Sequence, residues 1–587
     1  MKLKQLATAV ILATGSCATL AATYSVTPLV TNDSGQNGFA QSIDNAGTTI
    51  MAIQDEFRPP IDVTLFDEDF FTDNANLTDP DAAAEGNFND DDYLFMIGVL
   101  QTSRANNASQ VQRLAEFRSY AQSGNADDVI PGLDVVSAST GNLSQSVRTI
   151  ARDSVDGNYF VGASESPYLP LIYTNGEGNE IRYILSDIRQ SAFVQVNDNT
   201  VRLAPTDTTL NGYSEAFGVN TNFQVAGFGT VDFSDGMDEA IANCEDEEER
   251  GDVPVELCFR NLRLAGSFFI PTDAPTQASA AAMTFQATFN VSSSTINATI
   301  WNLNASGQVV STDTYGVPFT PEADDETRYQ TRAFDINNNG IAVGDSHTGE
   351  VVDVTYAGEN QARRGYQYQA ATFSNDTTTI ILQDEENLNS SAIAVNDNNW
   401  VAGMVTRAPN EIARNRLFVH NLDTGETRYP SGFFTSSSVT ARNINNNNIV
   451  VGEADIEATN EAIRQRHAFM YDINTEEFIN LNTLISCDSP YTLINAVDIN
   501  DDNEIIVNAR IESEAKDGLG NDIIETDSST RMADKVVALK LTPIPNGELE
   551  DCSTDVVDPP RERQGASIHW ISIALLSVFG LVRRRKH

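Results

Sequence analysis

An internal repeat is the feature that most constrains how this chain can fold. A twelve-residue motif begins with alanine, has an Asn-rich centre and ends in glycine or valine. Its clear copies cover residues 333–344, 392–403, 441–452 and 496–507, and weaker copies cover residues 40–51, 151–162 and 216–227. Self-similarity at a period of about 50 residues indicates a repeat architecture. The longer intervals between the weaker copies leave room for interrupted units.

Each copy of the motif reads as strand, turn and strand. In the copy at 333–344, alternating apolar residues lead into Asn337, Asn338 and Asn339, and a β-branched run follows Gly340. Asn and Gly tolerate the positive φ of a tight hairpin turn. Further apolar elements follow at 371–373, 417–419 and 467–471. Repeated four-stranded units of this length are typical of β-propellers. We therefore expect an all-β fold, a β-propeller of about seven four-stranded blades that occupies residues 22–545.

Residues 57–132 depart from the repeat. Apolar residues recur there at intervals of three and four, at Leu94, Ile97, Leu100, Val111, Leu114, Phe117 and Ala121. This spacing predicts one or two amphipathic helices. We expect a small helical insertion that packs on the propeller.

The N-terminus has the features of a Sec signal peptide, which we place at residues 1–21. Lys2 and Lys4 precede an apolar run at 6–13, and the small residues Thr19 and Ala21 occupy the −3 and −1 positions of a cleavage site. The run is too short to span a bilayer, which argues against an uncleaved anchor. A lipoprotein would use Cys17, but the expected leucine three residues earlier is missing.

The C-terminus predicts a transmembrane helix. After a linker at 546–564, Gly565 and Ala566 open an apolar tail at 565–587, which ends in Arg583, Arg584, Arg585 and Lys586. Four terminal cations oppose translocation, so residues 566–582 should lie in the inner membrane with the tip in the cytoplasm. This tail resembles the GlyGly-type sorting signal of Gram-negative surface proteins, which a rhomboid-like sorting protease cuts near the glycine pair. Ala566 replaces the second glycine, and a permanent tail anchor is the alternative.

The body resembles the HAF repeat family of extracellular proteins, named for the tripeptide that stands here as His467, Ala468 and Phe469. The whole chain looks like a Gram-negative surface-protein family of unknown function that carries such repeats. The resemblance implies the fold, export through Sec, inner-membrane anchoring and then a cell-surface or secreted location, but no activity. Other copies have Gln369 or Ala370, and Arg416, in place of His467. We therefore expect His467 to pack between strands.

Four cysteines of the body predict two disulfides in an oxidising compartment. Three pairings are possible. We favour Cys244 with Cys258 and Cys487 with Cys552, because neighbours in sequence close the smaller loops. None of the four has the CxxC spacing of a zinc or redox site.

Charge excludes one class of partner. The chain has 36 Lys and Arg against 83 Asp and Glu, a formal net charge of −47. Such a surface repels nucleic acid and attracts divalent cations. The chain has 5 histidines, which leaves little material for histidine-based catalysis.

Two copies of the motif resemble the first half of a calcium loop. Alternate oxygen-bearing side chains suit a hard cation. The candidate ligands are Asp335, Asn337, Asn339, Asp498, Asn500 and Asp502. Ser346 stands where the closing acid of the first loop would be, and plain hairpin turns explain the same residues without metal. Both interpretations stay open, and calcium is the one cofactor that we consider.

No strong catalytic motif is present. Residues 344–347 superficially resemble a serine hydrolase block, but GxSxG, HExxH and GxxxxGK[ST] motifs are missing. We expect a non-enzymatic binding or scaffold propeller with an unknown external ligand. One alternative is an extracellular hydrolase of polysaccharide or peptide, which clustered acids with shifted pKa values in the channel would favour. The other is a tail-anchored periplasmic assembly factor.

Overall fold

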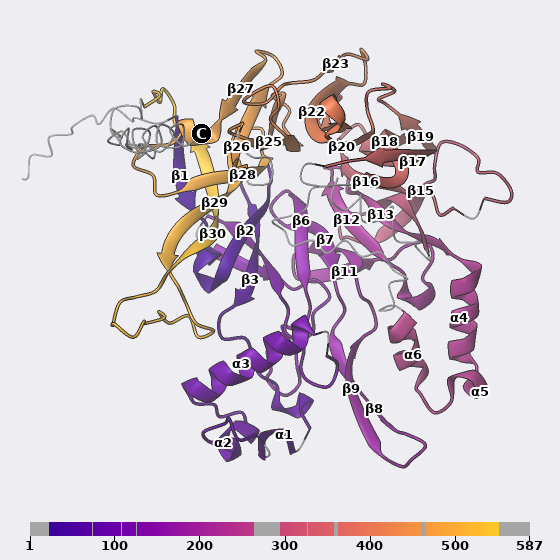
Figure 1. The fold of residues 1–587 in the computed structure, drawn as a ribbon, viewed down its shortest axis with the longest axis vertical. Helices are drawn as coiled ribbons and strands as arrows, with labels where there is room; N and C mark the ends of the chain where they lie inside the picture. The colour runs from indigo at the N-terminus through magenta and orange to yellow at the C-terminus, as the bar shows by residue number, and fades with distance from the viewer. Residues whose placement is uncertain are drawn as a thin grey trace, which may run out of the picture.

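The computed structural model describes residues 23–262 and 294–550, apart from Glu68, Asp73, Asn107, Asn125, Glu326 and the stretches 357–361 and 459–463. In this part of the chain, seven four-stranded antiparallel sheets form a ring (Figure 1). The first strands of successive blades contact one another around the centre of this ring. The prediction of an all-β propeller with seven blades is confirmed.

The blades are numbered in chain order. Blade 1 contains β2 (Gly35–Ile43), β3 (Thr49–Glu56), β4 (Phe117–Ser123) and β5 (Ala126–Ile130). Blade 2 contains β6 (Thr149–Val155), β7 (Tyr159–Ser164), β10 (Ser191–Val196) and β11 (Asn199–Leu203). Blade 3 contains β12 (Ser214–Val219), β13 (Gln224–Phe233), β14 (Ser294–Leu303) and β15 (Val309–Tyr315). Blade 4 contains β16 (Thr331–Ile336), β17 (Ala342–Val354), β18 (Arg363–Ser374) and β19 (Thr377–Ile380).

The last three blades complete the ring. Blade 5 contains β20 (Asn389–Val395), β21 (Trp400–Arg407), β22 (Arg414–Asn421) and β23 (Thr427–Arg428). Blade 6 contains β24 (Val439–Ile444), β25 (Ile449–Asp455), β26 (Arg466–Asp472) and β27 (Glu477–Asn480). Blade 7 contains β28 (Thr492–Ile499), β29 (Ile505–Glu514), β30 (Met532–Pro543) and β1 (Tyr24–Pro28). Short 3-10 helices lie in the connections, at Val30–Ser34, Val63–Leu65, Thr209–Asn211, Pro409–Glu411 and Leu481–Thr483.

The N-terminal strand closes the ring. β1 pairs antiparallel with β30, with Tyr24 opposite Pro543 and Pro28 opposite Leu539. One blade is therefore built from both ends of the described chain. This pairing ties the first blade to the last, so that the ring cannot open without breaking a strand pair.

Each copy of the sequence motif is the first hairpin of one blade. The motif at 333–344 runs from β16 through its turn into β17, and the weaker copies at 40, 151 and 216 do the same in blades 1 to 3. The glycine that ends the motif allows close packing: a Cβ on Gly344 would lie 1.8 Å from the carbonyl oxygen of Arg332. Among the described residues, the long intervals between weak copies contain insertions and no further blade.

Three consecutive blades carry large insertions between their second and third strands. Blade 1 inserts α1 (Asp69–Thr72), α2 (Pro80–Ala84) and α3 (Asp90–Ala105); blade 2 inserts the hairpin of β8 (Tyr168–Thr174) and β9 (Glu180–Ser186); blade 3 inserts α4 (Asp235–Glu245), α5 (Glu247–Arg250) and α6 (Val255–Leu262). All three lie together in the lower part of Figure 1. We call them the insertion layer.

The predicted helical insertion is confirmed only in its first half. Met96, Ile97 and Leu100 of α3 are buried, as the spacing predicts. Phe117 and Ala121, however, belong to β4 of blade 1, so the range 57–132 is too long. Both faces of β4 are covered, and every residue from 117 to 122 is buried. A strand that is buried on both faces lacks the alternation of apolar and polar residues that marks a half-buried strand. Its apolar residues happened to recur at intervals of three and four, which is the spacing of an amphipathic helix.

Candidate functional site

The Asn-rich turns lie side by side around one end of the central channel and are bonded to one another. The side-chain amide of the first turn residue donates to the backbone carbonyl of the equivalent residue in the next blade, at 2.9 to 3.2 Å. The five bonds run from Asn220 to Asn337, Asn337 to Asn396, Asn396 to Asn445, Asn445 to Asn500 and Asn500 to Asp44. We call this arrangement the amide ring.

Each amide also closes its own turn. In blade 4, Oδ1 of Asn337 accepts hydrogen bonds from the N–H groups of Asn339 (3.1 Å) and Ile341 (3.0 Å). Only Asn and Gln side chains supply both a carbonyl acceptor and an NH₂ donor, and Asn is short enough to bond its own turn. Blade 1 has Asp44 here, and its carboxylate accepts from the N–H of Gly157 in blade 2 (2.7 Å). The repeat therefore encodes contacts between blades as well as hairpins.

A second ring lies deeper in the channel. In every first strand the pairing register shifts after the motif alanine, which makes a β-bulge. The residues just after the bulge are Ser42, Asp153, Gly218, Asp335, Ala394, Asn443 and Asp498. Three of these seven positions hold carboxylates. We call Asp153, Asp335 and Asp498 the channel acids.

The channel acids join neighbouring blades. Asp335 accepts from the N–H of Ile336 (2.7 Å) through Oδ1 and from the N–H of Val395 in blade 5 (2.8 Å) through Oδ2. Asp153 accepts in the same way from Val219 of blade 3 (2.8 Å). Asp498 accepts from Ile43 of blade 1 (2.8 Å). Each carboxylate thus uses one oxygen within its own strand and the other on the next blade.

Their surroundings raise the pKa of all three acids. Desolvation in the channel raises the pKa of Asp335 to about 7, against the stabilising effect of its two backbone N–H donors. Desolvation and the nearby carboxylate of Asp498 hold the pKa of Asp153 well above its ordinary value. The pKa of Asp498 is also raised, again chiefly by burial. Perturbed carboxyls of this kind occur both in active sites and in structural clusters.

Cavities lie on either side of the channel acids. One, of about 160 Å³, is lined by the bulge residues Gln41, Arg152, Phe217, Phe334, Ile393, Arg442 and Val497. The other, of about 190 Å³, lies on the side of the amide ring. An engineered cavity of roughly 150 Å³ holds a benzene molecule, so each of these spaces is large enough for a small group.

The arginines of the first cavity are paired with buried acids. Arg152 forms an ion pair with Glu215, whose side chain is fully buried, and Arg442 binds Glu453 at 3.0 Å. Arg152 also lies over the ring of Phe217, at 4.7 Å from its centroid, and Phe217 meets Phe334 edge to face at 5.3 Å. These contacts fix the cavity wall across blades 2, 3 and 4.

The structure places the six candidate calcium ligands in these two rings and on the turns. Asp335 and Asp498 are channel acids, Asn337 and Asn500 belong to the amide ring, and Asn339 and Asp502 are exposed turn residues. Asn339 donates to the carbonyl of Asp397 (3.0 Å). Within the described ranges, no group of three or more His, Cys, Asp or Glu residues is arranged to hold a metal ion. Calcium binding stays a prediction.

The residues that resemble a hydrolase block have structural partners. Ser346 is buried and its hydroxyl donates to the carbonyl of His347 (2.9 Å), while Nδ1 of His347 accepts from the N–H of Gln330 (3.1 Å). Asp345 binds Arg332 at 2.9 Å. Burial lowers the pKa of His347 to about 3, so this ring is neutral at pH 7. His467 packs beside Asn480, at 3.1 Å.

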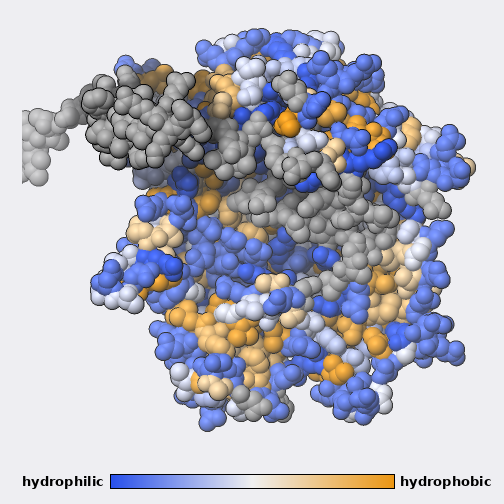
Figure 2. Space-filling model, in the orientation of Figure 1, coloured by the Kyte–Doolittle hydropathy of each residue, from blue (hydrophilic) through white to orange (hydrophobic). Residues whose placement is uncertain are grey.

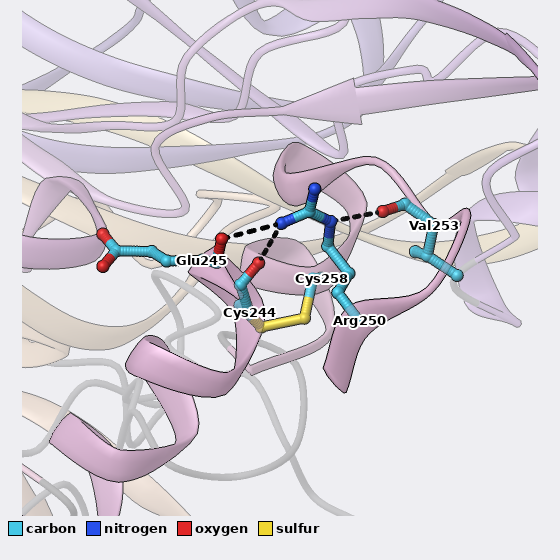
Figure 3. The surroundings of a disulfide bond; sticks show 5 residues. All are labelled: Cys244, Glu245, Arg250, Val253 and Cys258. Atoms are coloured by element: carbon cyan, nitrogen blue, oxygen red, sulfur yellow. Dashed lines mark hydrogen bonds between the residues drawn. A yellow bond between two sulfur atoms is a disulfide. The ribbon is translucent and has the colours of Figure 1, made fainter. Parts of the chain in front are cut away.

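A disulfide holds the blade 3 insertion together (Figure 3). Cys244 and Cys258 are bonded, with their Cα atoms 5.6 Å apart, and so link α4 to α6. The Arg250 side chain lies beside the bond and donates to the carbonyls of Cys244 (2.6 Å) and Val253 (2.7 Å).

Cys487 is also disulfide-bonded, but Cys552 lies outside the described residues. So do Ala21, Gly565 and Ala566, and the predicted tail helix with them. In the part of the chain described, no helix is long and apolar enough to cross a membrane.

Sequence reasoning missed the α4–α6 insertion, although a signal was present. Met237, Ile241 and Cys244 are spaced by four and three residues and are buried. Ser234 caps the helix, because its side chain accepts from the N–H of Met237. In the sequence analysis, the long interval after the copy at 216–227 was left to interrupted repeat units, and this interpretation concealed the helical pattern.

The fold and the site together define a seven-bladed propeller whose blades are joined by polar side chains around the channel. The chain belongs to the family described as Protein of unknown function (DUF3466), whose model matches residues 1–585. No curated protein sequence matches the chain.

Several solved propeller-containing structures are distantly similar. The β-propeller domain of the Trilobed protease from Pyrococcus furiosus has 7% identity and a TM-score of 0.34 over 90% of this chain and 99% of that one. The Pyrococcus horikoshii acylaminoacyl peptidase has 9% identity and a TM-score of 0.35 over 84% and 52%. This chain therefore spans about half the length of that peptidase. An oligogalacturonate lyase in complex with manganese has 10% identity and a TM-score of 0.26 over 68% and 96%. At these scores the similarities carry no functional argument.

Proposed function

We propose that this protein is an exported, non-enzymatic binding propeller of the Gram-negative cell envelope, which presents an external ligand surface on the face that carries the insertion layer. The observation that carries this proposal is the contact between insertions of three consecutive blades. Arg182 of β9 donates to the carbonyls of Thr64 and Phe66 in blade 1 (both 3.0 Å), and the N–H of Gly176 donates to Asp252 in blade 3.

The insertion layer has the character of a binding surface. Leu169 and Ile172 of β8 are 55% and 49% exposed. Figure 2 shows apolar colour in the lower half of the view, within a largely hydrophilic surface. Rigid scaffolds commonly present ligand-binding groups on the loops of one face.

The ends of the chain support the proposed location. A signal peptide at 1–21 would direct export, and a GlyGly-type tail at 565–587 would hold the HAF-type body at the inner membrane until a sorting protease cuts near Gly565 and Ala566. The test is the intact mass of the native protein in membrane, periplasmic, surface and medium fractions. We expect a surface or secreted form that begins near Ala22 and ends near Gly565. A membrane-bound form that keeps Arg583 would instead favour the tail-anchored assembly factor.

The channel acids favour a second candidate function, hydrolysis of polysaccharide or peptide. Their raised pKa values and common location are the features that a carboxylate-based active site would have. Against this, both oxygens of Asp335 already accept backbone N–H groups. Turnover of polysaccharide or peptide substrates that Asp335→Asn and Asp498→Asn abolish, with folding intact, would establish the enzyme.

A further inference from the structure

One of the two cavities beside the channel acids lies on the side of the insertion layer. It has a volume of about 160 Å³ and is separated from the amide ring by the channel acids. The first strand of each blade starts at the insertion-layer face and ends at the amide ring, so this cavity lies on the side of the proposed ligand surface. We call it the channel cavity. All seven blades line it, and its wall changes character around the ring.

Three consecutive blades supply an apolar wall. Phe217 of blade 3, Phe334 of blade 4 and Ile393 of blade 5 line the channel cavity and belong to one hydrophobic cluster. The rings of Phe217 and Phe334 meet edge to face at 5.3 Å, so packing holds both in position. Such a wall favours a ligand that removes C–H groups from water when it binds.

The opposite wall carries two amide groups that the fold leaves unused. Gln41 of blade 1 and Asn495 of blade 7 come from the blades that meet where the ring closes, and both line the channel cavity. The amide oxygen of Asn495 is buried and accepts no hydrogen bond from any described residue. The side chain of Gln41 also forms no hydrogen bond with the residues described. Buried polar atoms without a partner are uncommon in folded proteins, and a ligand with hydrogen-bond donors would supply the missing partner.

Carboxyl groups form the floor of the channel cavity. The two oxygens of Asp335 accept one backbone N–H each, but a carboxylate has about four acceptor positions, so the others can accept hydroxyl donors. Asp153 and Asp498 line the same space. Arg152 and Arg442 are also in the wall, and each is bound to a buried glutamate. Because groups of both signs line the cavity, an ion of either sign would meet like charges, and an uncharged ligand suits it better.

We infer that the channel cavity binds one uncharged six-membered ring that carries hydroxyl groups, as in a monosaccharide. The C–H face of the ring packs on Phe217 and Phe334, and its hydroxyl groups donate to Asn495, to Gln41 and to the channel acids. A cavity of roughly 150 Å³ holds one benzene molecule, so this space matches a single ring. The inference rests on the proposed function and specifies the chemistry of its ligand.

The test is a ligand-observed NMR titration of the purified protein with D-glucose, D-galactose, D-mannose and N-acetyl-D-glucosamine. Cyclohexanol, a six-membered ring with a single hydroxyl, is titrated in parallel. At least one sugar should bind more tightly than cyclohexanol. Asn495→Leu replaces the amide by an apolar group of similar size and should weaken binding of that sugar about tenfold. No described residue bonds the lost oxygen, so the midpoint of urea unfolding should not fall.

Gln41→Met and Gln145→Met form a matched pair of variants. Gln145 also has a buried amide oxygen without a partner among the described residues, but it does not line the channel cavity. Gln41→Met should weaken sugar binding, and Gln145→Met should leave it unchanged. If Asn495→Leu does not fold, the comparison of these two variants takes its place.

Three results would overturn the inference. The first is that none of the four sugars binds to the unchanged protein. The second is that cyclohexanol binds as tightly as the best sugar. The third is that the Asn495→Leu and Gln41→Met variants bind the sugar as tightly as Gln145→Met does. Failure of the proposed function would appear separately, as a wrong location in the fractionation, and would leave sugar binding by the purified protein unchanged.

Discussion

The Oδ2 atom of Asp335 in blade 4 accepts a hydrogen bond from the backbone N–H of Val395 in blade 5, at 2.8 Å. The same bond recurs from Asp153 to Val219 and from Asp498 to Ile43. The acids that are candidate metal ligands or catalysts therefore join neighbouring blades.

Asp335→Ala should destabilise the protein. The substitution leaves the N–H groups of Ile336 and Val395 without their acceptor, and hydrogen bonds to a charged group are worth about 1.5 to 3 kcal/mol each. We expect the free energy of unfolding in urea to fall by about 2 kcal/mol or more. The exposed Asp128→Ala is the control and should change it little. If Asp335→Ala leaves the free energy of unfolding unchanged, a structural role for this acid is excluded.

The stability of the protein should depend on the protonation of Asp335. Its pKa is raised from 3.8 to about 7 by folding, so the folded state holds the proton more tightly. The resulting stabilisation is complete below about pH 4 and is lost as the pH rises through 7. Buried His347, whose pKa falls to about 3, has the opposite effect: below pH 6.5, its contribution to the stability of the folded state decreases as the pH falls.

Asp335→Asn isolates this effect, because it removes the titrating group and leaves His347 in place. Unfolding free energies measured from pH 5 to pH 8 should decline less for Asp335→Asn than for the unchanged protein. Parallel pH profiles for the two proteins would mean that Asp335 has the same pKa in the folded and unfolded states.

Asn32, which follows β1 in the chain, also helps to close the ring by binding β30. Its Nδ2 donates to the carbonyl of Ala538 (2.7 Å), and its Oδ1 accepts from the N–H of the same residue (2.9 Å). Asn32→Ala would leave the buried N–H of Ala538 unpaired, at a cost of about 1 to 3 kcal/mol, whereas its carbonyl still accepts from the N–H of Leu29 (3.1 Å). We expect a lower thermal midpoint than for the exposed Asn76→Ala. Equal midpoints would show that β1 alone secures the closure.

The Cys244 and Cys258 pair should stabilise its insertion and not the propeller. A disulfide over a loop of about 15 residues contributes roughly 3 kcal/mol. In the Cys244→Ser, Cys258→Ser double variant, proteolysis should be faster within 235–262, while amide exchange in β16 and β20 stays slow. Faster exchange in those inner strands would contradict this prediction.

The fold could be predicted from the sequence because its repeat is local. Each motif contains a complete hairpin, and the order Asn337, Asn338, Asn339 and Gly340 determines a turn regardless of the rest of the chain. The contacts between blades could not be predicted in this way. The amide of Asn337 bonds Asn396, 59 residues away, and no periodicity of a single sequence distinguishes that bond from an Asx turn or a metal ligand.

The arginine contacts between blades 5 and 6 could not be predicted for the same reason. Arg416 and Arg464 come from different blades and meet only because the loop at Ser436 and Ser437 lies between them. In the comparison of the repeat copies, Arg416 was noted only because it stands where another copy has His467. The spacing of Asp335 and Asp498 resembles a calcium loop, but no sequence spacing indicates that both carboxylates also accept hydrogen bonds from backbone N–H groups of the next blade.

The most direct test of the central claim, that the Asn and Asp residues of the repeat join blades, compares Asn337→Ala with the unchanged protein by urea unfolding in EDTA and in calcium chloride. Asn337 belongs to the amide ring and is also a candidate calcium ligand. The structural role predicts that Asn337→Ala lowers the unfolding midpoint equally in both buffers and that calcium does not stabilise the unchanged protein. A calcium-induced rise in the midpoint that Asn337→Ala abolishes, with no loss of stability in EDTA, would contradict it.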